Sequence, residues 1–265
     1  MPVDLGFRQY GDGSVRAIVL HDWFCDHSNW DAMTPYLTPD QFTYVFADLR
    51  GYGDSRNLSG EYTLGEAASD VIALADRLGW KTFSLIGHSM SGLVVQRIAQ
   101  LVEGRVSRGV AITPVPAVGI GLDRATVEVF QAIALGDDQA RLAAVGPMWG
   151  DRLSATWTKY KLRRWRETVE PRAAAKYVGM WGCENISEGG GGIKTPMLII
   201  AAEKDAPPFQ AAALNTSTLP FYPNGRLVSL DDCGHYPMQE QPPLLATLVE
   251  RFLSESREDR RFGPA

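Results

Sequence analysis

Residues 87–92 place a serine where it could become a nucleophile. They read Gly-His-Ser-Met-Ser-Gly, follow an apolar run and precede a segment with helical periodicity. A sharp strand-to-helix turn forces its central residue into strained backbone geometry and pushes that side chain out of the sheet. The residues two before and two after the centre must be small. Gly87 and Ser91 meet this demand, although Ser91 stands where glycine is usual. The spacing therefore predicts Ser89 as a nucleophile.

A serine hydroxyl needs a base that takes its proton, and His235 is the candidate. It follows the apolar run 226–230 in the sequence Cys-Gly-His-Tyr-Pro and precedes the final helical pattern. The base in turn needs an acid that fixes its tautomer. We expect Asp205, which follows the apolar run 196–201, to be that acid, with Glu203 as a rival. The chain order would then be Ser, Asp, His.

A tetrahedral intermediate also needs hydrogen-bond donors for its oxyanion. The backbone N–H of Met90 is one candidate, because it lies at a helix N-terminus directly after the nucleophile. The second should come from the loop after the first apolar run, and we expect the backbone N–H of Trp23 to supply it.

Apolar runs and helical patterns alternate along the chain. Strands are predicted at Val15–Leu20, Phe42–Ala47, 83–86, Val106–Ile112, 196–201 and 226–230. Helices are predicted at 63–78, Met90–Leu101 and 244–253, each with apolar residues on one face. Strands that are apolar throughout and separated by helices indicate an α/β fold, in which a mostly parallel central sheet is covered by helices on both faces.

Residues 118–192 interrupt this alternation. They contain no convincing strand pattern, only helix-like segments and a run of four glycines at their end. We interpret them as a helical cap, or lid, inserted into a core made of residues 1–117 and 193–254. Residues 255–265 are charged, end in Gly-Pro-Ala and are expected to be a flexible tail.

Four of the seven tryptophans lie in the predicted cap. They either pack the cap against itself or line a pocket beneath it. As pocket residues we expect Trp149, Trp157, Tyr160, Met180 and Trp181, which would favour a hydrophobic or aromatic group on the substrate. The basic run 159–166 is expected to be a solvated helix face.

Composition excludes several other classes of protein. The chain has 265 residues, 45% hydrophobic and 22% charged, which is ordinary for a globular protein and excludes disorder. A net charge of −5 argues against a nucleic-acid partner, and the absence of an 18-residue apolar run argues against a membrane partner. No signal-peptide pattern opens the chain, so a cytoplasmic location is expected. The three cysteines, Cys25, Cys183 and Cys233, are expected to be free thiols, and neither a metal nor another cofactor is predicted.

Five stretches together resemble the α/β-hydrolase fold superfamily. They are Leu20-His21, the Asp-Leu-Arg-Gly-Tyr-Gly-Asp-Ser string at 48–55, residues 87–92, Asp205 and Gly234-His235. The resemblance covers nearly the whole chain and implies a capped serine hydrolase similar to esterases and lactonases. One departure is Asp22, which stands where this family usually has glycine. Because a carboxylate aimed at the oxyanion would oppose catalysis, we expect Asp22 to point away, in a locally hydrogen-bonded turn.

The resemblance leaves several activities open. The leading one is hydrolysis of a small-molecule carboxylic ester or lactone through an acyl-enzyme. The same triad and cap are also compatible with hydrolysis of a carbon–carbon bond in a vinylogous ketone, or with a hydrolase-like ligand receptor of slow turnover. Cofactor-free oxygenases of this fold are a further alternative, but they tend to carry the acid after the strand Val106–Ile112, where this chain has none before Asp123.

Overall fold

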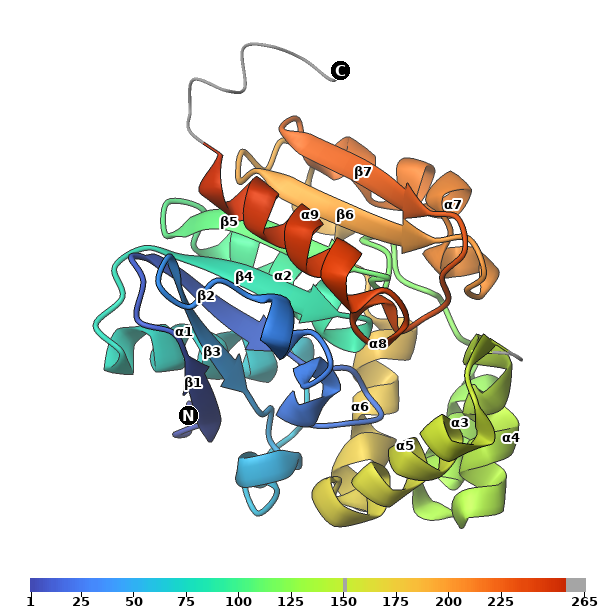
Figure 1. Ribbon diagram of the computed structural model, residues 1–265. Coiled ribbons are helices and arrows are strands. Elements are labelled where there is room, and N and C mark those ends of the chain that lie inside the picture. The colour runs from blue at the N-terminus through green and yellow to red at the C-terminus, as the bar shows by residue number, and fades with distance from the viewer. Residues whose placement is uncertain (150–151, 256–265) are drawn as a thin grey trace.

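A seven-stranded sheet forms the centre of the computed structural model, which describes residues 1–149 and 152–255 (Figure 1). The strand order is β1-β3-β2-β4-β5-β6-β7. Only β1 runs antiparallel to its neighbour, β3. The strands are β1 (Phe7–Tyr10), β2 (Val15–Leu20), β3 (Phe42–Ala47), β4 (Phe83–His88), β5 (Val106–Ile112), β6 (Met197–Ala202) and β7 (Gly225–Leu230). The predicted α/β class is therefore confirmed.

Helices cover both faces of this sheet. Figure 1 shows α9 in front of it, with α1 and α2 behind. The helices are α1 (Leu64–Arg77), α2 (Met90–Leu101), α3 (Arg124–Leu135), α4 (Asp138–Trp149), α5 (Ala155–Thr168), α6 (Pro171–Cys183), α7 (Ala211–Ser217), α8 (Pro237–Glu240) and α9 (Pro242–Ser254). None of the described helices is both long and apolar enough to cross a membrane.

Residues 118–192 contribute α3 to α6, and no named strand lies in the part of this segment that is described. In Figure 1 these helices lie beyond the carboxyl ends of the strands. Helix α6 packs against α3 and also contacts the core, because the indole Nε1 of Trp23 donates to the carbonyl oxygen of Ala174 at 2.8 Å. The segment thus lies over the carboxyl edge of the sheet, where the expected catalytic residues follow the ends of their strands.

The expectation that residues 159–166 form a solvated helix face is wrong for Lys161. This side chain on α5 has no exposed surface. Its ammonium lies 4.2 Å from the centre of the Tyr236 ring and 3.5 Å from Oδ1 of Asn29. Helix α5 packs against the core on this side, so the lysine is turned inward, while Lys159 and Arg166 remain exposed.

The expected flexible tail begins with a residue that is held in place. Glu255 accepts a hydrogen bond from Arg226 at 2.6 Å. Residues 256–265 lie outside the described residues. The three cysteines are free thiols, as expected, and Cys25 and Cys233 are buried.

The turn between β4 and α2 is crowded at Gly87. A Cβ placed there would lie 2.3 Å from the carbonyl oxygen of Ser91 and 2.7 Å from a methyl group of Val95. Because the nearest obstacle is backbone, the turn cannot relax by a side-chain rotation. Only glycine lets the strand and the helix approach this closely.

Gly87→Ala should therefore lower the free energy of unfolding by about 1–3 kcal/mol through overpacking. Gly104→Ala is the matched control, since a Cβ at Gly104 meets no heavy atom within 4 Å. Urea denaturation of both variants and of the parent protein measures the difference. Equal midpoints and slopes for Gly87→Ala and the parent would contradict the crowding argument.

Candidate active site

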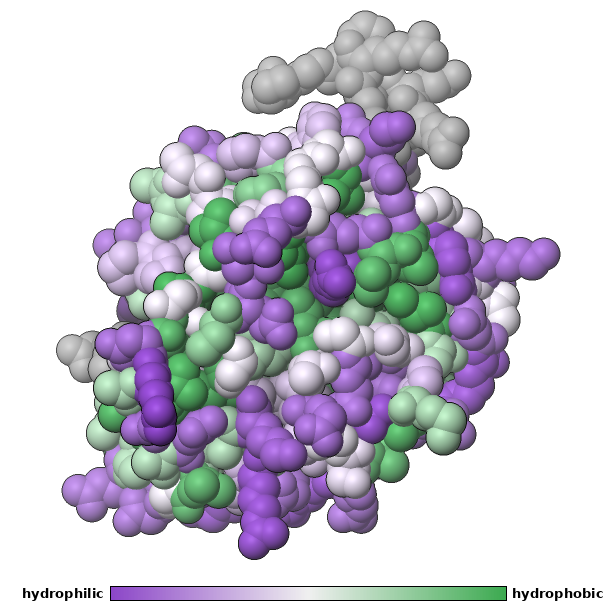
Figure 2. Space-filling view, turned by 180° about the vertical axis from the view of Figure 1, so that it is seen from behind, coloured by the Kyte–Doolittle hydropathy of each residue, from purple (hydrophilic) through white to green (hydrophobic). Residues whose placement is uncertain are grey.

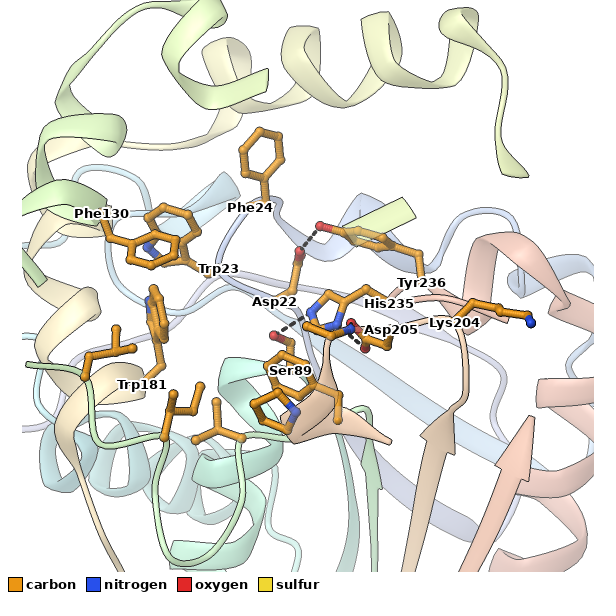
Figure 3. Close-up of a pocket in the computed structure, with 16 residues that line it drawn as sticks. Asp22, Trp23, Phe24, Ser89, Phe130, Trp181, Lys204, Asp205, His235 and Tyr236 are labelled. Atoms are coloured by element: carbon orange, nitrogen blue, oxygen red, sulfur yellow. Dashed lines mark hydrogen bonds and ion pairs between the residues drawn. The ribbon is translucent and has the colours of Figure 1, made fainter. Parts of the chain in front are cut away.

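Ser89 stands between β4 and α2 with a backbone that residues with side chains rarely adopt. Its φ is 54° and its ψ is −116°, which is a strained conformation. Its N–H donates to the carbonyl oxygen of Ile112 at 2.9 Å, and its carbonyl oxygen accepts from the N–H of Val115 at 3.1 Å. These bonds to β5 and to the segment after it hold the strained turn. Ser89 lines a cavity at this edge of the sheet (Figure 3).

The imidazole of His235 lies between the Ser89 hydroxyl and a carboxylate. Its Nε2 is 2.9 Å from Oγ of Ser89, and its Nδ1 is 2.6 Å from Oδ2 of Asp205 (Figure 3). All three side chains are buried. With Nδ1–H donating to the carboxylate, Nε2 is free to accept the serine proton. The structure thus brings together the three residues that the sequence selected from the turns after β4, β6 and β7.

The rival acid Glu203 is engaged elsewhere. Its carboxylate accepts a hydrogen bond from the hydroxyl of Ser229 and another from the N–H of Ala211 at 3.2 Å. It therefore stabilises the start of α7, and the contact with His235 is made by Asp205.

His88 supports His235 from behind, and sequence reasoning did not select it. Its Nε2–H donates to the carbonyl oxygen of His235 at 2.6 Å, and its Nδ1 accepts from the amide of Asn29 at 3.0 Å. Thr113 donates to the same carbonyl oxygen at 3.2 Å. Burial lowers the pKa of His88 to about 3, so its ring is neutral at pH 7. The residue before the proposed nucleophile thereby fixes the loop of the proposed base.

The loop after β2, which carries the expected oxyanion donor Trp23, is fixed by contacts of His21, Leu49 and Tyr52. Nδ1–H of His21 donates to the carbonyl oxygen of Asp22 at 2.7 Å, and Nε2 of His21 accepts from the N–H of Leu49 at 3.0 Å. The hydroxyl of Tyr52 donates to the carbonyl oxygen of Trp23 at 2.9 Å. These contacts orient the loop through its carbonyl groups. No described residue accepts a hydrogen bond from the backbone N–H of Trp23 or from that of Met90.

Asp22 is not held in a local turn, contrary to the expectation. Its Oδ2 accepts a hydrogen bond from the hydroxyl of Tyr236 at 2.9 Å, across more than 200 residues of sequence, and its side chain lines the cavity. Burial opposes ionisation of this carboxyl group. The charge of Lys161 and the bond from Tyr236 oppose that effect, and the pKa of Asp22 is lowered. The sequence offered no sign of a partner so distant.

The cavity in front of Ser89 has a volume of about 420 Å³, and its walls are largely apolar. Aromatic side chains enclose it from three parts of the chain: the loop after β2, the helices after β5, and the segments after β6 and β7. Lining residues that sequence reasoning missed are Phe24, Val115, Ile120, Leu122, Phe130, Lys204, Ala206, Pro208, Phe209 and Tyr236. Several are single apolar residues in loops, where no periodicity marks the face that turns inward.

The five expected pocket residues are placed differently from one another. Trp181 lines the cavity. Its neighbour Met180 is buried and is not among the described lining residues, because successive residues of a helix point about 100° apart. Trp157 and Tyr160 line a separate surface hollow beside Gln239. The side chain of Trp149, at the end of α4, lies outside what the structure describes.

The buried side chains of Asp26, His27 and Asp48 form a cluster in which the possible metal-ligand atoms lie as close together as they would around a metal ion. Its oxygen atoms, however, already bind internal partners. Nδ1 of His27 lies 2.8 Å from Oδ2 of Asp48, and Arg164 binds Asp26 at 2.9 Å. Burial opposes protonation of His27, but the hydrogen bond with Asp48 prevails and raises the pKa of His27. The cluster is an ion-pair network that ties α5 to the core.

Comparison with known proteins identifies the family. A model of the alpha/beta hydrolase family matches residues 17–248. The chain therefore belongs to this family, whose members are generally hydrolytic enzymes.

Individual relatives differ in the reactions that their names describe. The chain is 27% identical to a non-heme chloroperoxidase of Streptomyces lividans over 91% of this chain and 94% of that protein. It is 35% identical to a 2-heptyl-3-hydroxy-4(1H)-quinolone dioxygenase of Mycobacteroides abscessus, over 37% of this chain and 38% of the relative. The solved enol-lactonase of Burkholderia xenovorans LB400 superposes with a TM-score of 0.80 at 25% identity, over 95% of this chain and 96% of the other. The reaction must therefore be argued from the site itself.

The neutral state of His88 should make the protein less stable in acid. At pH values between its lowered pKa of about 3 and the ordinary pKa of 6.5, the His88 side chain binds a proton in the unfolded chain but not in the folded chain. From pH 7.5 to pH 5.0 this effect removes about 2 kcal/mol of the free energy of unfolding. His88→Gln should lack this part of the loss, which urea denaturation at pH 7.5 and 5.0 measures.

His27→Gln is the control of opposite sign. The pKa of His27 is raised, so its contribution to stability is present in acid and disappears as the pH rises through the folded value. If the parent and His88→Gln lose equal stability between the two pH values, His88 is not held neutral.

Proposed function

We propose that this protein hydrolyses a carboxylic ester or a lactone of a hydrophobic small molecule through an acyl-enzyme. The observation that carries the proposal is the continuous hydrogen-bonded series from Asp205 through His235 to Ser89, with the serine on the wall of an apolar cavity. A nucleophile, its base and the group that orients the base are the parts that acyl transfer requires.

In this reaction Oγ of Ser89 attacks the carbonyl carbon while Nε2 of His235 takes the hydroxyl proton. Asp205 holds the imidazole in the required tautomer and stabilises the imidazolium. The negative charge on the carbonyl oxygen is bound by the backbone N–H groups of Trp23 and Met90. His235 then protonates the leaving alkoxide. A water molecule, activated by the same imidazole, attacks the acyl-serine, releases the acid and restores Ser89.

Residues 118–192 serve in this proposal as the cap that closes the cavity and selects the substrate. Phe130 of α3 and Trp181 of α6 line the cavity, and their rings pack edge to face with centroids 5.0 Å apart. When an apolar acyl chain or ring moves from water onto this wall, its binding free energy becomes more favourable by about 25 cal/mol for each Å² of apolar surface that is buried. The chemistry at Ser89 and the selectivity of the cap are therefore separable.

Ser89→Ala should lower kcat/KM for 4-nitrophenyl butanoate by at least about 10⁴-fold, because the acyl acceptor is lost. His235→Ala should cause a loss of similar size, and the double variant should be little worse than either. Ser91→Ala is the matched control, since the Ser91 hydroxyl has no hydrogen-bond partner among the described residues. Retained turnover in Ser89→Ala would refute the proposed nucleophile.

The same assay separates the alternative chemistry. A vinylogous dienol ketone offered beside the ester would be cleaved by the parent protein if carbon–carbon bond hydrolysis were the true activity. A single turnover followed by a persistent covalent product would instead indicate a receptor.

Trp181→Ala should change the acyl preference more than the chemistry. We expect kcat/KM for 4-nitrophenyl octanoate to fall about tenfold and that for the acetate to change less, because the longer chain loses apolar contact. Tyr160→Ala is the control, because Tyr160 lines the separate hollow and not this cavity. An equal change for both esters would show that the indole does not bind the acyl group.

A further inference from the structure

Asp22 is a fixed polar group in the wall of a largely apolar cavity. It directly precedes Trp23, the proposed oxyanion donor, and it is 2% exposed. One carboxylate oxygen, Oδ2, accepts a hydrogen bond from the hydroxyl of Tyr236, as the dashed line in Figure 3 shows. The carbonyl oxygen of the same residue is held by His21. Side chain and backbone are therefore both oriented before any substrate arrives.

The second oxygen of this carboxylate, Oδ1, is buried and has no hydrogen-bond partner among the described residues. Burying a carboxylate oxygen without a donor costs free energy, and native structures rarely leave such an atom unsatisfied. Because the residue Asp22 lines a cavity, we take a ligand in that cavity as the source of the missing donor. The cavity also contains Ser89, so that ligand and the substrate of the serine would be one molecule.

The charge of Asp22 is already balanced from behind. Lys161 on α5 is fully buried, and its ammonium lies against the face of the Tyr236 ring whose hydroxyl binds Asp22. The attraction of Lys161 is one of the effects that keep the pKa of Asp22 low. A cationic group on the ligand would add an uncompensated charge to this pair, at a high cost in an apolar cavity. A neutral hydrogen-bond donor satisfies Oδ1 without that cost.

The geometry points to a donor-binding subsite at Asp22 Oδ1, which selects esters or lactones bearing a neutral hydroxyl or amide N–H close to the reacting carbonyl. This inference rests on the proposed function and deepens it by naming the substrate class. The apolar cavity would bind the body of the substrate, and Asp22 would accept a hydrogen bond from the substrate's donor group. The residue that departs from the family's usual glycine thereby becomes a determinant of specificity.

The position of Asp22 beside the oxyanion loop strengthens this selection. A substrate without a donor leaves the carboxylate unscreened next to the carbonyl oxygen that becomes negative, which opposes the reaction. A substrate whose hydroxyl binds Oδ1 satisfies the acceptor and reduces this opposition. Sites with buried polar groups discriminate strongly against analogues that lack the matching group.

The test compares substrates that differ only in their donor. The parent protein is assayed with methyl mandelate and with its O-methyl ether, and likewise with methyl 3-hydroxy-3-phenylpropanoate and its ether. We expect kcat/KM to favour the hydroxy ester at least tenfold in one of the two pairs. Equal values within each pair would overturn the inference and assign Oδ1 to a buried water.

Asp22→Asn then changes the acceptor while keeping its shape. Its amide oxygen can still accept from Tyr236, and its NH₂ group replaces Oδ1. The preference for the hydroxy ester should fall to about one, through loss on the hydroxy ester with no loss on the ether. Asp31→Asn, an exposed carboxylate away from this cavity, should keep the parent's preference. Equal losses on both esters would show that Asp22 only positions Tyr236, and would overturn the inference.

Binding separates this inference from the proposed function. In Ser89→Ala, calorimetry should show at least tenfold tighter binding of the preferred hydroxy ester than of its ether. If the parent hydrolyses no ester of either kind, the proposed function fails, while this binding ratio still tests the subsite. Equal affinities would refute the donor subsite whether or not the protein is an esterase. This measurement does not need the Asp22→Asn variant, so it remains decisive if that variant does not fold.

Discussion

The strained turn at Ser89 is the constraint on which the rest of the site depends. A positive φ at a residue with a side chain is unfavourable, so neighbouring structure must impose it. Here β5 does so, through Ile112 and the segment up to Val115, which bind the Ser89 N–H and carbonyl oxygen. Gly87 lets strand and helix come close enough for these bonds to form. The parallel sheet therefore does more than support the serine, since its register determines where the hydroxyl points.

The remaining groups reach the serine because the parallel strands end at one edge. Asp205 and His235 follow β6 and β7, and Trp23 follows β2. Loops of this kind are mobile unless they are anchored, and three hydrogen bonds provide the anchors. His88 and Thr113 hold the backbone of His235, while Tyr236 joins the same loop to Asp22. The proposed base and the proposed oxyanion loop are thus fixed relative to each other by hydrogen bonds between loops as well as by the sheet.

The sequence predicted the parts of this arrangement that local patterns encode. Apolar runs located six of the seven strands, and the small residues around Ser89 located the turn. The edge strand β1, with half-exposed Phe7 and Tyr10, has no apolar run and was missed. Partners distant in sequence were also missed: Lys161 was expected in solvent and Asp22 in a local turn, yet each is held by contacts with Tyr236. Such contacts depend on how residues 118–192 and the loops pack on the sheet, which no local pattern records.

The lining of the pocket also combines features that the sequence predicts with features that depend on the three-dimensional packing. Tryptophan is conspicuous in a sequence, but only the inward face of a helix lines a cavity, so Trp181 does and Met180 does not. Loop residues such as Ile120 and Phe209 line it because of where their loops cross the sheet edge. The residue types correctly indicated an apolar pocket, but the three-dimensional packing determines which residues line it.

The central claim, that Ser89 is an activated nucleophile open to the cavity, can be tested by mass spectrometry. The protein would be treated with an alkyl fluorophosphonate, which reacts with serines activated by a neighbouring base. The account predicts one phosphonyl group per chain, found on the peptide that contains Ser89, and little labelling when His235 is replaced by alanine. An unlabelled protein, or a label on another residue, would contradict it.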